Sequence, residues 1–111
     1  MDQNSPEQEA FNTLLKRLYP KELLERLSTL AGKDVRLSSE HEERDTSGFL
    51  RLRVPVVAEK DVLGHYVISL ERGTRNVVGV HYSGQNPRTG RQVILGAYGS
   101  RPDFSDLTKG L

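Results

Sequence analysis

The sequence contains no cysteine and no tryptophan, and four tyrosines and three phenylalanines are its only aromatic residues. Without cysteine the chain has no disulfide, no thiolate nucleophile and no cysteine-ligated zinc. No apolar run reaches transmembrane length, and residues 1–5 lack the basic and apolar regions of a signal peptide. The absence of cysteine fits a reducing compartment. We therefore expect a cytoplasmic protein, and 111 residues fit a single domain over residues 1–111.

The chain also lacks the motifs of the well-known reaction types. Its glycines form neither a GxGxxG fingerprint nor a phosphate-binding loop. Glu71 is the sole acid of the expected central strands, so the carboxylate pair of a glycosidase is missing. Residues 38–48 combine acids with His41 but do not follow the pattern of an EF-hand loop. The sequence therefore predicts no catalytic residue, no metal site and no cofactor.

Three apolar runs rich in Val, Ile and Tyr dominate the second half of the chain: Tyr66–Leu70, Val77–Tyr82 and Val93–Tyr98. Turn-forming residues separate them, which predicts a three-stranded antiparallel ribbon. Gly73 stands first in a two-residue loop, which favours a type II′ turn with Leu70 opposite Val77.

The second turn is expected over residues 86–90, closed by Gln85 and Arg91, with Gly90 free to adopt a positive φ. This register sets Tyr82 opposite Ile94. Alternation then divides the ribbon into two faces. The predicted core face carries Tyr66, Ile68, Leu70, Val77, Gly79, His81, Val93, Leu95 and Ala97. The other carries His65, Val67, Ser69, Val78, Val80, Tyr82, Ile94, Gly96 and Tyr98.

Residues 5–31 have the spacing of amphipathic helices. Ser5 is a suitable N-cap, leucines recur every three or four residues, Pro20 interrupts the pattern and Gly32 fits the position after a helix end. We expect a helical hairpin or one kinked helix.

The middle of the chain alternates between polar and apolar residues. Residues 35–37 predict a short edge strand, residues 38–48 an exposed polar loop, and residues 49–58 a strand. Leu50, Leu52, Val54 and Val56 lie on one side of that strand, and Arg51 and Arg53 lie on the other.

Pro55 cannot donate to a sheet ladder, so this strand is expected at an edge or with a bulge. Residues 99–111 are expected to form a C-terminal tail with a last helical turn. The predicted fold is α+β, with the helices packed on a mostly antiparallel sheet of four to five strands.

The function that we expect is a small non-catalytic binding module, with a protein partner or a second copy of itself meeting the second face. That face is too apolar to be left wholly in water. Its expected partner-binding residues are Val67, Val80, Tyr82, Ile94 and Tyr98.

A first alternative is nucleic-acid binding through arginines at the hairpin turns. Residues 1–49 carry 7 basic and 10 acidic side chains, whereas residues 50–111 carry 9 and 5. Arginines at turns can contact phosphates, and tyrosines on one face can stack on bases. The candidate residues are Arg72, Arg75, Arg88, Arg91 and Arg101.

Part of this basic region resembles a known DNA-binding element. Residues 86–91 read Asn-Pro-Arg-Thr-Gly-Arg, and residues 102–104 read Pro-Asp-Phe. These residues resemble the arm of the histone-like HU/IHF family, whose arm proline wedges between base pairs in the minor groove. The resemblance implies that Pro87 is a wedge and that Arg88 and Arg91 contact phosphates. That family differs in having fewer strands before its arm, a longer basic arm and a more positive charge.

A second alternative is a small-molecule-binding or enzymatic domain with a pocket near His65 or His81. The register above places these two histidines on opposite faces, where they share neither a metal nor a proton. A nucleophile with a base in reach is not recognisable in the sequence.

Overall fold

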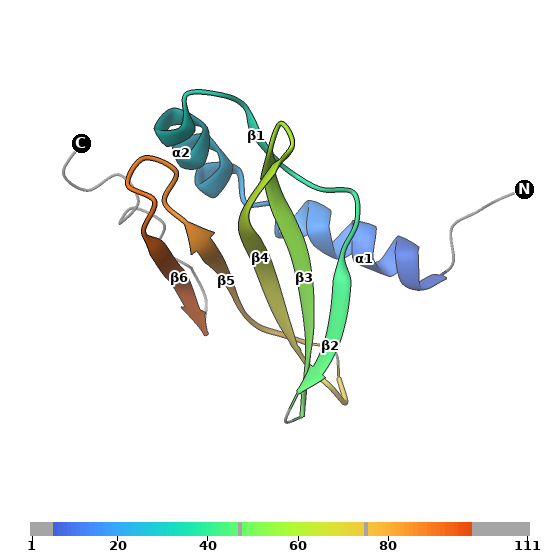
Figure 1. Cartoon of the computed structure of the whole chain (residues 1–111). Helices are drawn as coiled ribbons and strands as arrows, with labels where there is room; N and C mark the ends of the chain where they lie inside the picture. The colour runs from blue at the N-terminus through green and yellow to red at the C-terminus, as the bar shows by residue number, and fades with distance from the viewer. Residues whose placement is uncertain (1–5, 47, 75, 99–111) are drawn as a thin grey trace, which may run out of the picture.

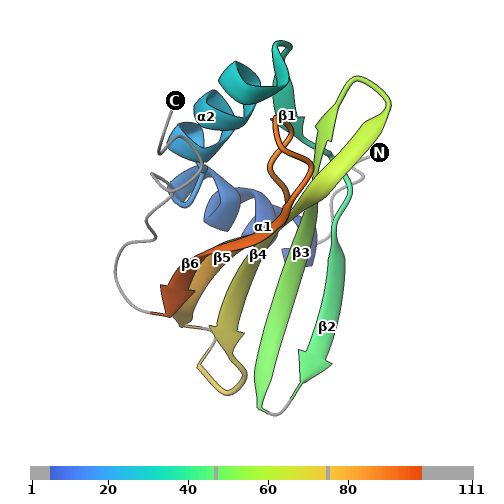
Figure 2. The same cartoon turned by 60° about the vertical axis from the view of Figure 1, so that its left-hand side comes forward.

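The computed structural model describes residues 6–46, 48–74 and 76–98. Two helices precede six antiparallel strands, and both helices lie on the same face of the sheet (Figures 1 and 2). We call that face the inner face and the opposite one the outer face. The elements are α1 (Pro6–Arg17), α2 (Lys21–Ala31), β1 (Val35–Leu37), β2 (Glu42–Thr46), β3 (Phe49–Ala58), β4 (Asp61–Glu71), β5 (Val77–Gln85) and β6 (Gln92–Tyr98).

The two helices form as the leucine spacing predicts. Helix α1 ends before Pro20, and α2 begins directly after it. Gly32 follows α2 with φ 71°, and its N–H donates to the carbonyl of Ser28 at 2.9 Å, which closes the last turn. The segment is thus a pair of helices. No described helix is both long and apolar enough to cross a membrane.

The described sheet has six strands, whereas four to five were expected. Its order is β1-β3-β4-β5-β6, and β2 pairs with the same edge of β3 as β1 does. The edge strand at residues 35–37 is confirmed. The exposed loop expected over residues 38–48 is wrong over Glu42–Thr46, because this polar segment pairs with β3 along its whole length.

Pro55 explains why β1 and β2 are two strands. Its carbonyl accepts a hydrogen bond from Ser38 N–H at 2.8 Å, so its nitrogen points to the same edge. A proline nitrogen offers no proton to a neighbour there, and the pairing lapses between Leu37 and Glu42. Strand β3 is therefore not at an edge, but the edge strand beside it is broken at Pro55, and the register with β4 shifts just after it.

The predicted pairing of β4 with β5 holds at the turn and fails beyond it. Leu70 lies opposite Val77 as expected, but Ser69 lies opposite Gly79, so Val78 is the extra residue of a β-bulge. From Gly79 to the end of β5, each residue therefore lies on the face opposite to the predicted one. Gly73 also lacks the positive φ of a type II′ turn.

The second turn is also displaced by one residue, and Tyr82 lies opposite Leu95 rather than Ile94. The Asn86 N–H donates to the carbonyl of Arg91 at 2.8 Å, and Gly90 has the expected positive φ, 76°. The two one-residue errors offset each other in β6. Val93 and Leu95 therefore lie on the inner face as predicted.

The core lies between the helices and the inner face. The phenol of Tyr66 donates to the carbonyl of Leu18 at 2.7 Å and so joins the end of α1 to β4. The core also contains Phe11, Leu23 and Leu27 of the helices with Leu52, Val54, Val56, Ile68, Leu70, Val80 and Tyr82 of the sheet.

The inner face also contains a close backbone approach between β4 and β5. Gly64 and Gly84 lie opposite each other. A Cβ on Gly64 would come within 2.5 Å of the Gly84 Cα and 2.9 Å of the Tyr82 ring. Glycine at both positions lets the Tyr82 phenol reach the carbonyl of Gln85 at 2.8 Å. The expected tail, residues 99–111, lies outside the described residues.

Candidate functional site

The predicted partner-binding residues do not form one surface. Val67 and Ile94 lie on the outer face, and Ile94 is 74% exposed. Val80 and Tyr82 lie on the inner face, where the Tyr82 side chain is 0% exposed, because the bulge at Val78 turns the rest of β5 over. The side chain of Tyr98 is outside the described part of the chain. Assigning Val80 and Tyr82 to the second face was wrong.

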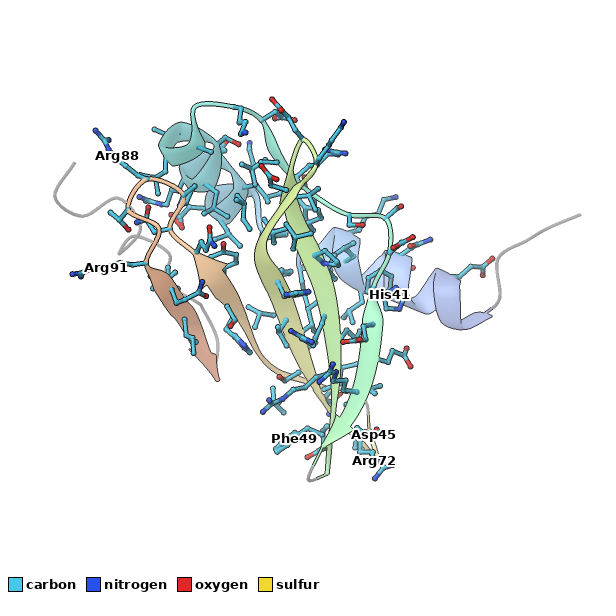
Figure 3. All side chains as sticks on the ribbon, viewed as in Figure 1. His41, Asp45, Phe49, Arg72, Arg88 and Arg91 are labelled. Atoms are coloured by element: carbon cyan, nitrogen blue, oxygen red, sulfur yellow. The ribbon has the colours of Figure 1, made fainter. Side chains whose placement is uncertain are left out.

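The arginines of the hairpin turns lie at opposite ends of the sheet. Arg72 is in the β4–β5 turn, where its Nη2 lies 3.1 Å from Asp45 Oδ2. Arg88 and Arg91 are in the β5–β6 turn at the other end (Figure 3). The nine residues of β5 between these turns span roughly 30 Å. These three arginines therefore form no single patch; Arg75 and Arg101 lie outside the described residues.

The two strand histidines lie on the same face, contrary to the prediction. His65 is opposite Ser83 and His81 is opposite Val67, so both imidazoles project from the outer face. They are diagonal neighbours on adjacent strands, a spacing at which long side chains reach each other. The bulge at Val78 brings them together.

The outer face also carries three arginines that are neighbours in the sheet. Arg44 of β2 lies directly opposite Arg51 of β3, and Arg53 follows two residues later on the same side of β3. They border a hollow of about 190 Å³, whose other lining residues are Val67, His81 and Ser83. Four strands thus supply one cationic depression on a face that no described helix covers.

Glu42 holds two of these arginines together. Its Oε1 accepts one hydrogen bond from Arg44 Nε and another from Arg53 Nη1, each at 3.0 Å. The Arg44 hydrogen bond and charge, followed by those of Arg53, lower the pKa of the Glu42 carboxyl. The cluster of three guanidinium groups and one carboxylate has a formal charge of +2.

The histidines add no positive charge to this face at neutral pH. Burial first, and then the charges of Arg51 and Arg53, lower the pKa of His81 below 6.5. Burial and the Arg53 charge lower the pKa of His65, whereas the Glu42 charge opposes that shift. Arg53 Nη2 lies 3.5 Å from His65 Nδ1. A neutral imidazole can still donate one hydrogen bond at its other nitrogen.

Metal binding finds no support in the described residues, where no group of three or more His, Asp or Glu side chains converges. His41 instead stacks on Phe11 with the ring centroids 3.7 Å apart. A larger hollow of about 450 Å³ lies beside α2 and β1. Its Ser28 hydroxyl already accepts a hydrogen bond from Val35 N–H at 3.0 Å.

The sequence interpretation missed the arginine cluster. It placed Arg51 and Arg53 on the same side of β3, and the strict alternation of residues 50–54 was the signal. Arg44 was missed because β2 has no apolar residue in Glu42–Thr46 and so no periodicity. Comparison of the chain with protein-family models, curated protein sequences and solved structures gives no match. The likeness to the HU/IHF arm therefore rests on residues 86–91 and 102–104 alone.

Proposed function

We propose that the protein is a non-catalytic binding module whose outer sheet face binds an acidic segment of a partner protein. One observation carries this proposal: three arginines adjoin one another on a face that no described helix covers. The matching partner surface is one that brings carboxylates to the arginines and apolar side chains to Ile94, which is 74% exposed, whereas Val67 on the same face is only 4% exposed.

The arginine cluster lowers the stability of the fold when no partner is bound. Like charges directly opposite each other on an antiparallel pair are destabilising, as at Arg44 and Arg51. Glu42 compensates only part of this charge. A threonine or valine at these positions would form a sheet more readily. Residues that oppose stability are typical of functional surfaces, which supports a binding role.

Charge also favours a different protein over a second copy of this chain. A two-fold symmetric dimer places the same patch on both subunits. Two outer faces meeting in this way would bring two clusters of charge +2 together, and like-charge contacts of that kind are costly. An acidic partner meets the same face with the opposite charge. Arginine is also among the side chains enriched in protein interfaces.

Nucleic-acid binding has weaker support. Of the two tyrosines expected to stack on bases, Tyr82 is in the core, and the side chain of Tyr98 lies outside the described part of the chain. The arginines of the described turns are roughly 30 Å apart, at the two ends of β5. An enzymatic role for His65 or His81 has no stronger support, because Ser69, the hydroxyl that lies between them in the sequence, is 1% exposed.

The test is an NMR titration of the ¹⁵N-labelled full chain with a ten-residue peptide of alternating Glu and Val. A Lys-Val peptide of equal length and a ten-nucleotide oligothymidylate are the comparison ligands. We expect amide shifts along β2–β5 with the acidic peptide and none with the basic one. Arg51→Thr should weaken binding, whereas Arg88→Thr, which removes the same charge at a distant turn, should not.

Two results of the titration would overturn the proposal. One is the absence of saturable shifts with the acidic peptide. The other is tighter binding of oligothymidylate whose salt dependence falls in Arg51→Thr, because that loss would mean that Arg51 contacts phosphates of a nucleic acid. Sedimentation of the free protein gives a third result that would overturn it. A dimer that dissociates in Ile94→Asp would mean that a second copy of the chain, and not an acidic partner, covers the outer face.

A further inference from the structure

We propose that the hollow bordered by Arg44, Arg51 and Arg53 binds a phosphate group on a side chain of the partner, and that Glu42 is the internal anion which this phosphate displaces. This inference rests on the proposed function, because the phosphate belongs to the segment that lies on the outer face. The inference names the chemical group that anchors this segment to the outer face.

The structure already shows these arginines holding an anion. Arg44 and Arg53 come from different strands, yet both donate to the same oxygen of Glu42 at 3.0 Å. Two guanidinium groups that converge on one oxygen have the arrangement that an oxyanion requires. Arg51 adjoins both in the sheet, directly opposite Arg44 and two residues before Arg53, and lines the same hollow.

Glu42 also has the properties of a displaceable group. Its side chain is 53% exposed and comes from an edge strand, so it can turn out into water without disturbing the core. Salt bridges between such exposed groups contribute little to stability. An incoming anion therefore has little to overcome when it takes the place of this carboxylate.

Charge decides between a carboxylate and a phosphate as the incoming group. A glutamate of the partner would replace one carboxylate by another and gain little. A phosphorylated side chain carries a charge of about −1.5 to −2 and three strong acceptor oxygens at pH 7. These oxygens can engage the three guanidinium groups at once, and recognition of phosphorylated motifs by clustered arginines has this character.

The other groups around the hollow are compatible with this ligand. From β4, His65 faces Arg53, and from β5, His81 and Ser83 line the wall. At neutral pH the imidazoles and the hydroxyl can each donate one hydrogen bond. The Glu42 carboxylate is held by Arg44 and Arg53. Once it has turned away, the described hollow wall presents donors and the apolar Val67.

The experiment compares three forms of one peptide that alternates Glu and Val with one variable central residue: serine, glutamate or phosphoserine. Calorimetry on the full chain should give about tenfold tighter binding of the phosphoserine form than of the other two, since one charge-assisted hydrogen bond contributes about that factor. Arg51→Thr and Arg53→Thr should remove the advantage. Arg53→Lys, which keeps the charge but not the planar fork, should retain part of it.

Glu42→Gln is the sharpest variant, because a competing model predicts the opposite sign. If Glu42 occupies the phosphate site, removing its charge should raise the affinity for the phosphoserine peptide several-fold. If Glu42 only orients Arg44 and Arg53 for some other contact, the affinity should fall. Arg88→Thr is the matched control, and circular dichroism of each variant separates loss of binding from loss of fold.

The outcomes distinguish this inference from the proposed function. Equal affinity of the serine, glutamate and phosphoserine peptides, all dependent on Arg51, would overturn the phosphate site and leave the acidic-segment proposal standing. Failure of all three peptides to bind would overturn both. A phosphoserine advantage that persists in Arg51→Thr and Arg53→Thr would place the phosphate elsewhere and overturn the inference.

Discussion

The two faces of the sheet are built on different principles, and β3 shows both within a few residues. On the inner face Leu52, Val54 and Val56 are almost wholly buried under the helices. On the outer face Arg51 and Arg53 alternate with them and remain partly exposed. Burial of apolar area stabilises the inner face, whereas the outer face carries repulsion between like charges. The comparison separates residues that hold the fold from residues available for binding.

The sharpest test of this difference uses adjacent residues of β3. Leu52→Ala removes a fully packed side chain and should lower the free energy of unfolding by about 2–5 kcal/mol. Arg51→Thr should change it by less than about 1 kcal/mol, because repulsion from Arg44 is relieved as the arginine's own contacts are lost. Chemical denaturation measures both. A larger loss in Arg51→Thr than in Leu52→Ala would contradict the assignment of stability to the inner face.

A second test concerns the close approach of β4 and β5 on the inner face. Gly84→Ala places a methyl group against the Gly64 backbone and should destabilise the protein by about 1–3 kcal/mol. Gly73→Ala is the control, since a Cβ at this turn glycine meets nothing within 4 Å and its φ is not positive. Equal unfolding midpoints for the two variants would mean that the strands separate there at little cost.

A third test concerns the hydrogen bond that joins helix α1 to the sheet. Tyr66→Phe removes the donor to Leu18 and should cost about 0.5–1.5 kcal/mol. Tyr19→Phe, at an exposed position, should have almost no effect.

Burial raises the pKa of both Tyr66 and Tyr82 to about 12. Their contribution to stability is therefore complete below pH 10 and is lost as the pH rises toward 12. In an alkaline titration followed by absorbance at 295 nm, the buried tyrosines should ionise in a separate step near pH 12, and this step should be smaller in Tyr66→Phe. A step completed near pH 10 would contradict this burial.

Much of the inner face could be predicted from the sequence, because burial imposes periodicity. The leucine spacing gave both helices, and alternation gave the faces of β3 and β4. The faces of β5 were mispredicted beyond Val77, because one extra residue, Val78, reverses every position after it. Gly79 was the one hint of a bulge, since a glycine within a strand pattern often marks one.

The outer-face site could be predicted only in part, because pairing rather than periodicity assembles it. Arg51 and Arg53 could be placed on one side of β3 from alternation. Arg44 joins them only because Glu42–Thr46, a polar segment with no apolar pattern, pairs with β3 in one register. His65 and His81 share that face only because of the bulge. Residues far apart in the sequence are therefore brought together by a strand pairing and a bulge, neither of which has a clear sequence pattern.

The smallest expected effect is the response of the outer face to acid. The pKa values of His65 and His81 lie below 6.5 in the folded protein, so the unfolded chain binds more protons as the pH falls below 6.5. Their contribution to stability is present above pH 6.5 and is lost as the pH falls through the folded pKa values. Unfolding midpoints at pH 7.5 and 5.5 should therefore differ slightly, and by less in His81→Asn.

Proton NMR of the imidazole C2–H resonances gives the same information directly. Both strand histidines should titrate below 6.5, and His81 should shift upward in Arg51→Thr, because one of the cations that repel its proton is gone. The phosphoserine peptide should move it in the same direction, since an anion in the hollow favours the charged imidazole. An unchanged His81 pKa in both experiments would mean that neither Arg51 nor the bound phosphate acts on this imidazole.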